Sequence, residues 1–322
     1  MRDMAIHASA VRRISAIKDL APPVHLALGV FDGVHLGHQA VISRAVLAAR
    51  KEGGEAGVLT FDPYPLRVLA PEKAPRRLLA SLDHKATILE PFGVDFLLAI
   101  PFDRQRACLP AEDFVRELVN AGARTIAAGE DWRFGHNRTG DRNLLSQLSE
   151  KLGFSFQAVP PVMMDGERIS STRIRQAVRD GNLQAAARML GRPYSVMGKV
   201  LEGRKLGREL GFPTANIQPG DEQFPPDGVW AVQVKFGPKC FQGVANLGKQ
   251  PTVNGTDRTL EVHLFDFHDV LYNQVIEVFF LNFIRPVMKF DSISELKAQI
   301  QSDCTAAETF LAQLGDHPEE TG

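Results

Sequence analysis

The chain has 322 residues, of which 44% are hydrophobic and 23% are charged, and its formal net charge is −1. This length allows two domains with sizeable cores, and the near-neutral charge favours neither nucleic acid nor an anionic membrane surface as a partner. No apolar run has the length of a membrane span, and the first residues lack the apolar core of a secretory signal. We therefore expect a cytoplasmic protein, in which the three widely spaced cysteines stay reduced.

The first strand and helix of the chain carry the most informative motif. An apolar run predicts a buried strand over Val24–Phe31, a turn at Asp32–Val34 follows, and a helical pattern begins near His38. His35 and His38 are three residues apart at the start of that helix, so both lie on one face, beside unpaired N–H groups that favour anions. Gly37 lies between them and lets a ligand approach the backbone closely. The combination predicts a pocket for a triphosphate.

Two other interpretations of the histidine pair stay open. The residues could be surface or helix-capping histidines, which is the more frequent role of a bare HxxH pattern. They could also be zinc ligands, but zinc needs further ligands, and the region has neither a cysteine pair nor an HExxH motif. Their position directly after a buried strand favours the phosphate pocket.

The first half of the chain, residues 1–191, alternates between strand and helix. Repeated βα units predict a parallel, Rossmann-like sheet with helices on both faces, and ligands bind beyond the carboxyl ends of such strands. After the first strand, we expect strands at Ala56–Phe61, Phe96–Phe102, Thr125–Gly129 and Phe154–Val162. We expect helices at His38–Glu52, Ser81–Phe92, Ala111–Ala121, Asp141–Leu152 and Thr172–Leu190.

A basic segment with helix-capping hydroxyls, ERISSTRIR, occupies residues 167–175. Ser171 and Thr172 can cap the helix that begins there, and Arg168 adds positive charge beside them. A capped helix with a solvated basic flank would explain the segment by itself. Because the segment follows the fifth strand, at the same sheet edge as the histidine pair, we favour a second set of polyphosphate ligands.

From Tyr194 the pattern changes to short strands of period two, separated by turns rich in glycine, proline and asparagine. This pattern predicts an antiparallel β-barrel or sandwich. A final helix is expected from Ser292, because Glu295 three residues later completes a capping box. We therefore divide the chain into domains at 1–191 and 192–322.

The second domain opens with the glycine-rich basic stretch GRKLGRELGFPTANI, residues 203–217. Glycine permits tight backbone approach and the cations neutralise charge, so one interpretation is a flexible loop that folds over phosphates, and the other is a solvated hairpin loop. Thr214 and Asn216 then place a hydroxyl and an amide oxygen on the same side of a strand, a donor set that suits Mg²⁺. The expected phosphate contacts in the loop are Gly203, Lys205, Gly207 and Gly211.

Glu261 is an acid within an apolar strand, on the face opposite Leu260 and Val262. It is either an edge-strand carboxylate in water or a general base for an alcohol. The preceding segment 243–249 matches a P-loop up to its last position, where Gln250 replaces Ser or Thr. Its surroundings are all-β instead of a strand and a helix, so we regard that match as chance.

These motifs together resemble those of one family, the bifunctional riboflavin kinase/FAD synthetases. GVFDGVHLGH, which contains His35 and His38, resembles the HxGH signature of the adenylyltransferase superfamily, and RISSTRIR resembles its second signature. TFDPYP and GEDWRFG are similar to the family segments TFDPHP and GEDFRFG, from which they depart at Tyr64 and Trp132. GRELGFPTAN and LEVHLFDF resemble the kinase signatures, and NLGKQPT resembles NIGxRPT with Gln250 in place of Arg.

The resemblance spans about residues 20–315 and implies two ATP-dependent reactions. The C-terminal half would phosphorylate riboflavin to FMN, with Glu261 as the base and Mg²⁺ at Thr214 and Asn216. The N-terminal half would adenylylate FMN to FAD with release of pyrophosphate, using His35 and His38. The resemblance also implies ATP or phosphate contacts at Gly33, Gly37, Arg168, Ser171 and Thr172. It implies flavin contacts at Phe61 and Asp131.

Two rival functions stay open. One is an enzyme with a single activity, in which one half has decayed, and the departures at Tyr64 and Gln250 are its only support. The other is a non-catalytic flavin-binding protein, which would hold flavin without consuming ATP. The sequence predicts no oligomeric state.

Overall fold

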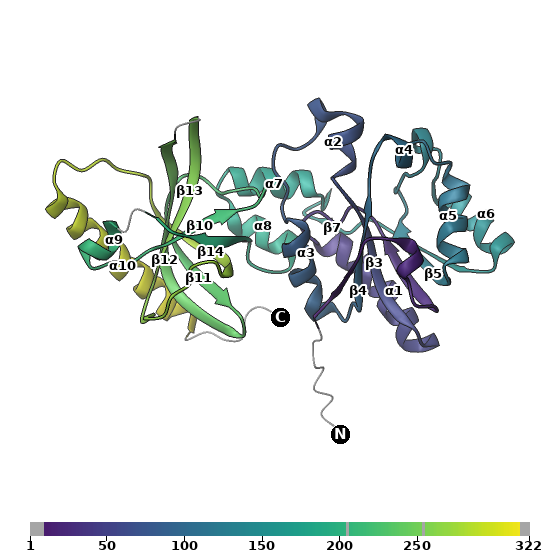
Figure 1. The fold of residues 1–322 in the computed structure, drawn as a ribbon, viewed down its shortest axis with the longest axis horizontal. Helices are drawn as coiled ribbons and strands as arrows, with labels where there is room; N and C mark the ends of the chain where they lie inside the picture. The colour runs from purple at the N-terminus through teal and green to yellow at the C-terminus, as the bar shows by residue number, and fades with distance from the viewer. Residues whose placement is uncertain (1–9, 204–205, 253–254, 316–322) are drawn as a thin grey trace, which may run out of the picture. The chain divides into compact units, whose positions relative to one another are not determined.

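A computed structural model of the chain describes residues 10–203, 206–252 and 255–315. Two compact units are present: one contains the chain up to Arg76 together with Leu82–Ser171, and the other contains Arg77–Ser81 and the chain from Thr172 onward. In Figure 1 the first unit is a sheet layered with helices, and the second is a barrel beside a long helix.

The first unit is built on a parallel sheet of six strands in the order β1-β4-β3-β2-β5-β6, which confirms the predicted fold class. The strands are β1 (Arg12–Ile14), β2 (Val24–Leu28), β3 (Glu55–Asp62), β4 (Phe96–Pro101), β5 (Ala123–Gly129) and β6 (Ser155–Val159). The sequence pattern does not predict β1, because three residues are too few to establish an alternation.

Two of these strands are shorter than their apolar runs predict. Strand β2 ends at Leu28 because Phe31 already has a left-handed backbone, with φ of 52°. Strand β6 ends at Val159 because the two prolines at 160–161 have no N–H to donate to a neighbouring strand. In both places the chain leaves the sheet at the carboxyl end of a strand, which is the edge where ligands bind in this architecture.

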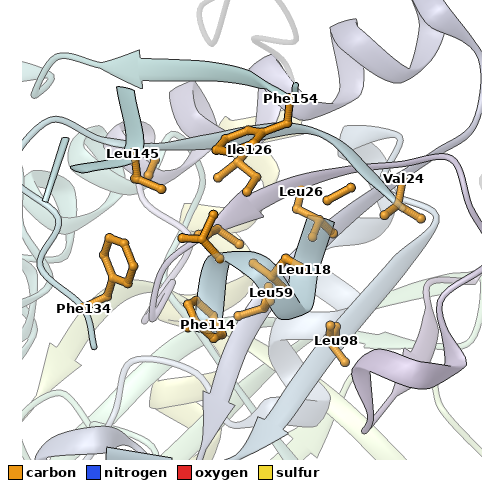
Figure 2. Close-up of a cluster of buried hydrophobic side chains, with 14 of the residues drawn as sticks. Val24, Leu26, Leu59, Leu98, Phe114, Leu118, Ile126, Phe134, Leu145 and Phe154 are labelled. Atoms are coloured by element: carbon orange, nitrogen blue, oxygen red, sulfur yellow. The ribbon is translucent and has the colours of Figure 1, made fainter. Parts of the chain in front are cut away.

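Helices cover both faces of the sheet. On one face, α5 (Ala111–Asn120) and α6 (Arg142–Leu152) join the strands in a single hydrophobic cluster, which includes Leu26, Phe114 and Leu145 (Figure 2). Helix α1 (Leu36–Glu52) packs on β2, β3 and β5 but contributes no residue to that cluster, so it covers the opposite face. Each large side chain buried in this way contributes roughly 1.5–3 kcal/mol to stability.

The other elements of the first half are short. They include α2 (Pro65–Leu69), α3 (Leu82–Leu89), α4 (Arg104–Ala107), and the hairpin strands β7 (Met163–Met164) and β8 (Glu167–Arg168). Two helices follow, α7 (Ser171–Arg179) and α8 (Leu183–Leu190), where the sequence predicts one helical stretch over Thr172–Leu190, and Asp180-Gly181 lies at the break between them.

The second unit contains a closed antiparallel barrel in the order β10-β13-β12-β11-β14-β9, which confirms the predicted barrel. Its strands are β9 (Ser195–Leu201), β10 (Ala215–Pro219), β11 (Gly228–Phe236), β12 (Lys239–Thr252), β13 (Gly255–Leu264) and β14 (Val275–Arg285). Trp230, Val232 and Val234 alternate along β11 and are buried. Val229 and Ala231, on the other face of the strand, belong to a separate cluster that includes residues of the last helix.

That last helix, α10 (Ile293–Gly315), packs against β11, β12 and β14. It begins as the capping box predicts, because the Glu295 amide donates to Ser292 Oγ at 3.2 Å. The glycine-rich basic stretch differs from its expected form as a flexible loop, since residues 206–210 make the short helix α9 (Leu206–Leu210). Lys205, an expected phosphate contact, lies outside the described residues.

Candidate active sites

The turn after β2 has an unusual backbone. Phe31, Gly33 and Val34 have φ values of 52°, 81° and 44°, all in the left-handed region. Only glycine enters this region freely, so the two larger residues cost about 1–3 kcal/mol each. Both are buried, with exposures of 1% and 0%, and packing of their side chains holds the strained turn. The turn leads directly into His35.

His35 caps the start of α1 with its side chain. Its Nδ1 atom accepts a hydrogen bond from the His38 amide at 3.3 Å. Because Nδ1 accepts, the proton of the neutral ring is on Nε2. The two imidazole rings stack, with centroids 3.5 Å apart and planes inclined by 17°. The predicted pair is therefore a single stacked unit at the helix N-terminus.

Gly37 leaves the space that this stacking requires. A Cβ atom at this position would lie 3.2 Å from both Cε1 and Nδ1 of His35, closer than side chains normally approach. The glycine is therefore needed for the placement of the ring, in addition to the close ligand approach expected from the sequence.

Replacing Gly37 by alanine should lower the FAD formation from FMN that the resemblance implies roughly fivefold, because the His35 ring must move by a few tenths of an ångström. Alanine has the higher helix propensity, so the unfolding temperature should not fall. Steady-state kinetics and thermal unfolding of the same preparation measure both effects. A loss of activity that accompanies a lower unfolding temperature would contradict this explanation.

His38 is the more enclosed member of the pair. Its ring meets the edge of Phe31 at a centroid distance of 5.3 Å, and its buried Nδ1 atom has no hydrogen-bond partner among the described residues. Burial lowers the pKa of His38 well below its usual value, and electrostatic interactions with His35, Lys85 and Arg168 lower it further. His38 is therefore uncharged at neutral pH, and binding of an anion would raise its pKa.

A cavity of about 920 Å³ opens at the carboxyl ends of the strands in the first unit. Its lining includes six of the residues that the sequence singles out: His35, Gly37, His38, Phe61, Asp131 and Arg168. Aromatic side chains form one part of the wall, where Trp132 stacks on Phe134 with centroids 4.4 Å apart. Arginines line another part, so the cavity offers both an apolar surface for a flat ring and cations for phosphate groups.

Arg168 and Asp131 form an ion pair within this cavity. Both side chains are about half exposed. Phosphate oxygens that bind Arg168 would compete with this carboxylate. Arg168, the expected phosphate contact, and Asp131, the expected flavin contact, thus contact each other.

Three other expected phosphate contacts have different surroundings. Gly33 forms the strained turn, and Ser171 Oγ donates to the carbonyl of Asp32 in that turn at 2.9 Å. Neither of these two residues is among the described residues that line the cavity. Thr172 Oγ1 accepts from the Arg175 guanidinium at 3.2 Å. Ser171 therefore supports the turn in this structure.

In the second unit, strand register brings the expected kinase residues together. Asn216 of β10 lies opposite Glu261 of β13, and Glu261 lies opposite Asn246 of β12. Leu260 and Val262 are fully buried, so Glu261 is on the other face of its strand, as the sequence predicts. Three side chains with oxygen acceptors thus form one row across three strands.

Two glycines of the basic stretch pack against the other kinase residues. A Cβ atom on Gly203 would overlap the side-chain amide of Asn216, and one on Gly207 would lie 3.2 Å from Thr214 Oγ1. Gly211 has φ of 92° and terminates α9. The absence of a side chain at Gly203 and Gly207 thus lets these two residues pack closely against Asn216 and Thr214.

The G203A variant should lose the riboflavin phosphorylation that the resemblance implies by on the order of 100-fold, because the new methyl group displaces Asn216. G220A is the matched control, since a Cβ atom at Gly220 would meet only Ser81 at 3.7 Å, an ordinary contact. FMN production by the two variants, measured by chromatography, tests this. Equal activities would show that the position of Asn216 does not matter.

Sequence reasoning missed three residues near these sites. His263 Nδ1 donates to the Pro213 carbonyl at 2.8 Å and so holds the segment that precedes Thr214. Its place two residues after Glu261, on the same strand face, is a signal that could have found it. Asn246 begins the motif NLGKQPT, but only strand register brings it beside Glu261, and the buried Lys85 has no local signal because tertiary packing brings it to its site.

Two family models match this chain, the FAD synthetase model over residues 18–173 and the riboflavin kinase model over residues 190–311. The bifunctional riboflavin kinase/FMN adenylyltransferase of Haemophilus influenzae is 41% identical over 289 residues, which cover 89% of this chain and 94% of that protein. The chain belongs to this bifunctional family. Its Escherichia coli K12 member is 42% identical and covers 89% of this chain and 92% of its own length.

A solved structure titled as a macrolide-efflux protein from Streptococcus pneumoniae has the same architecture as this family member. It is 34% identical, with a TM-score of 0.78, and the match covers 92% of this chain and 97% of the other. Among the helices in the described ranges, none is long and apolar enough to cross a membrane.

Proposed function

We propose that each half of the chain carries out one of the two reactions of its family. The chain phosphorylates riboflavin to FMN with ATP, and then transfers an adenylyl group from a second ATP to FMN, which gives FAD and pyrophosphate. The observation that carries this proposal is that the two family models match separate parts of one chain, and that each part holds a cluster of polar residues suited to its reaction. Residues 1–191 are the adenylyltransferase domain and residues 192–322 the kinase domain.

The adenylyl transfer uses the FMN phosphate as its nucleophile. That group is ionised at neutral pH, so it needs alignment and charge stabilisation more than a strong base. It attacks the α-phosphorus of ATP, and the bond to the bridging oxygen breaks to release pyrophosphate. His35 Nε2–H and the uncharged His38 donate hydrogen bonds to the phosphates, while the N-terminus of α1 and Arg168 stabilise the negative charge.

The flavin ring fits the aromatic part of the same cavity. Phe61 and Trp132 line it, and Asp131 is released to contact the flavin when phosphate takes its place on Arg168. An aromatic wall offers a face on which a flat ring stacks.

The kinase reaction needs a base for the ribityl hydroxyl. Glu261 takes that proton as the hydroxyl oxygen attacks the γ-phosphorus of ATP, and the bond from this phosphorus to the β,γ-bridging oxygen breaks to release ADP. Thr214 and Asn216 would hold Mg²⁺, since hydroxyl and amide oxygens are hard ligands and Glu261 lies opposite Asn216 in the register. When bound, the ion neutralises charge on the transferred phosphoryl group. Gly203 and Gly207 let the basic stretch approach these residues closely.

The experiment that tests this function is chromatography of the products from purified protein incubated with ATP and Mg²⁺. One reaction starts from riboflavin and a parallel reaction starts from FMN. FMN and FAD in the first and FAD in the second would support both sites. FMN without FAD would mean that the first unit is inactive. FAD formed only in the reaction that starts from FMN would mean that the second unit is inactive. Bound flavin with no consumption of ATP would favour a flavin-binding protein.

The expected cytoplasmic location is also part of this proposal. All three cysteines are free thiols, and the curated relatives named above are bacterial.

A further inference from the structure

A buried lysine that does not line the cavity lies behind the adenylyltransferase site. Lys85 of α3 is 6% exposed, and its ammonium group donates to the Val30 carbonyl at 2.8 Å. The same Nζ atom lies 3.4 Å from Thr60 Oγ1, which itself donates to the Val30 carbonyl at 2.9 Å. Two donors thus converge on one backbone oxygen.

The Val30 carbonyl is at the point where the chain leaves β2. The next residue, Phe31, is the first with a left-handed backbone, and the strained turn continues through Val34 to His35. A strained turn persists only where surrounding contacts hold it. The two hydrogen bonds on Val30 fix the start of the turn, and the Ser171 hydroxyl on the Asp32 carbonyl fixes its middle.

The charge of Lys85 is not explained by packing. Burying an ammonium group is costly unless it is paired, and an uncharged side chain of similar size would fill the same space. The titratable groups that face it are the carboxylates of Asp32 and Asp62, after β2 and at the end of β3, and the uncharged His38 of α1. On its own helix, Asp83 is paired with Arg13. The carboxylates keep the cation in place, and the cation acts on the histidine pair.

We propose that Lys85 is a positioning residue for adenylyl transfer, whose ammonium group holds the Val30 carbonyl and thereby the turn that presents His35 and His38. The proposal rests on the assignment of FMN adenylylation to the first unit. Lys85 does not line the cavity, so it acts through the backbone and through its charge.

This role predicts a loss of activity at alkaline pH. Burial lowers the pKa of Lys85 to about 8, although Asp32 and Asp62 oppose the shift. Above that pH the ammonium group becomes a neutral amine, and adenylylation falls. The unfolded chain still binds this proton up to the ordinary lysine pKa, so the contribution of Lys85 to folding stability rises over the same pH range. Unfolding therefore does not explain the loss.

The test measures FAD from FMN and FMN from riboflavin on the full chain. K85M should lower adenylylation by on the order of 100-fold and leave the kinase activity, which is assigned to the other unit, within about twofold. K85R keeps the charge at every accessible pH, so it should retain more activity than K85M and move the alkaline limb above about pH 9. K51M removes an exposed lysine of the same unit and should behave as wild type. C108S removes the thiol of a cavity residue, and its loss of adenylylation at alkaline pH should occur at the same pH as in wild type.

Several outcomes would overturn the proposal. Wild-type adenylylation in K85M would exclude any role for Lys85. An alkaline limb at the same pH in wild type and K85R would reduce Lys85 to a packing residue, as would equal losses in K85M and K85R at every pH. If K85M does not fold, the pH profiles of wild type and K85R still decide the question. A wild-type protein that makes no FAD from FMN would instead contradict the proposed function.

Discussion

Replacing His35 by alanine is expected to lower FAD formation from FMN by about 100-fold, in the range of losing one preorganised donor to developing charge. The ring is held by the His38 amide and by stacking on the His38 ring, so its Nε2–H is fixed in direction before substrate binds. Loss of the ring also removes the side-chain cap of α1. FMN formation from riboflavin should be unchanged, because that reaction is assigned to the other unit.

The measurement is the initial rate of each reaction with saturating ATP, with H268A as the control because His268 is an exposed histidine outside the first unit. Loss of the cap costs about 1 kcal/mol of stability, which is too little to unfold the unit. A folded H35A protein in which both reactions fall together would contradict the assignment of separate sites.

Replacing Glu261 by glutamine should have the reverse effect, with FMN formation reduced about 100- to 10,000-fold and FAD formation from FMN unchanged. Glutamine keeps the size of the side chain and its place in the row between Asn216 and Asn246, but it cannot accept the hydroxyl proton. The loss should therefore appear in kcat, while the KM for riboflavin changes little.

The control for this variant is D269N, which neutralises an exposed carboxylate of the same unit. Rates measured from riboflavin and from FMN separate the two steps. If E261Q retains the wild-type rate of FMN formation, Glu261 is a structural carboxylate of the barrel and the base is another group.

Local sequence explains the parts of the sites that depend on short spacing. His35, Gly37 and His38 are adjacent in the chain, so their arrangement follows once a helix is predicted to start there. The pattern of apolar residues also predicts the parallel sheet and the barrel, because periods of 2 and 3.6 are local properties. It does not predict where β2 ends, because the left-handed backbone of Phe31 depends on how the turn packs.

Contacts between distant parts of the chain could not be predicted. Lys85 is 55 residues from Val30, and nothing in its own helix indicates that it is buried beneath the histidine turn. The row of Asn216, Glu261 and Asn246 depends on the register of three strands, which the sequence does not specify. Ser171 matches a phosphate-contact position by its motif, yet in this structure its hydroxyl binds the Asp32 carbonyl.

The two sheets differ in how they could aggregate during synthesis. The barrel closes on itself, so its six strands leave no edge on which another chain could add a strand. The parallel sheet, which is translated first, has two edges, β1 and β6. Strand β1 has only three residues and carries Arg12 and Arg13, which pair with Glu55 and Asp83, while β6 stops at two prolines. Short, charged or proline-ended edges discourage such pairing, so the nascent first half should stay monomeric while the barrel is still being made.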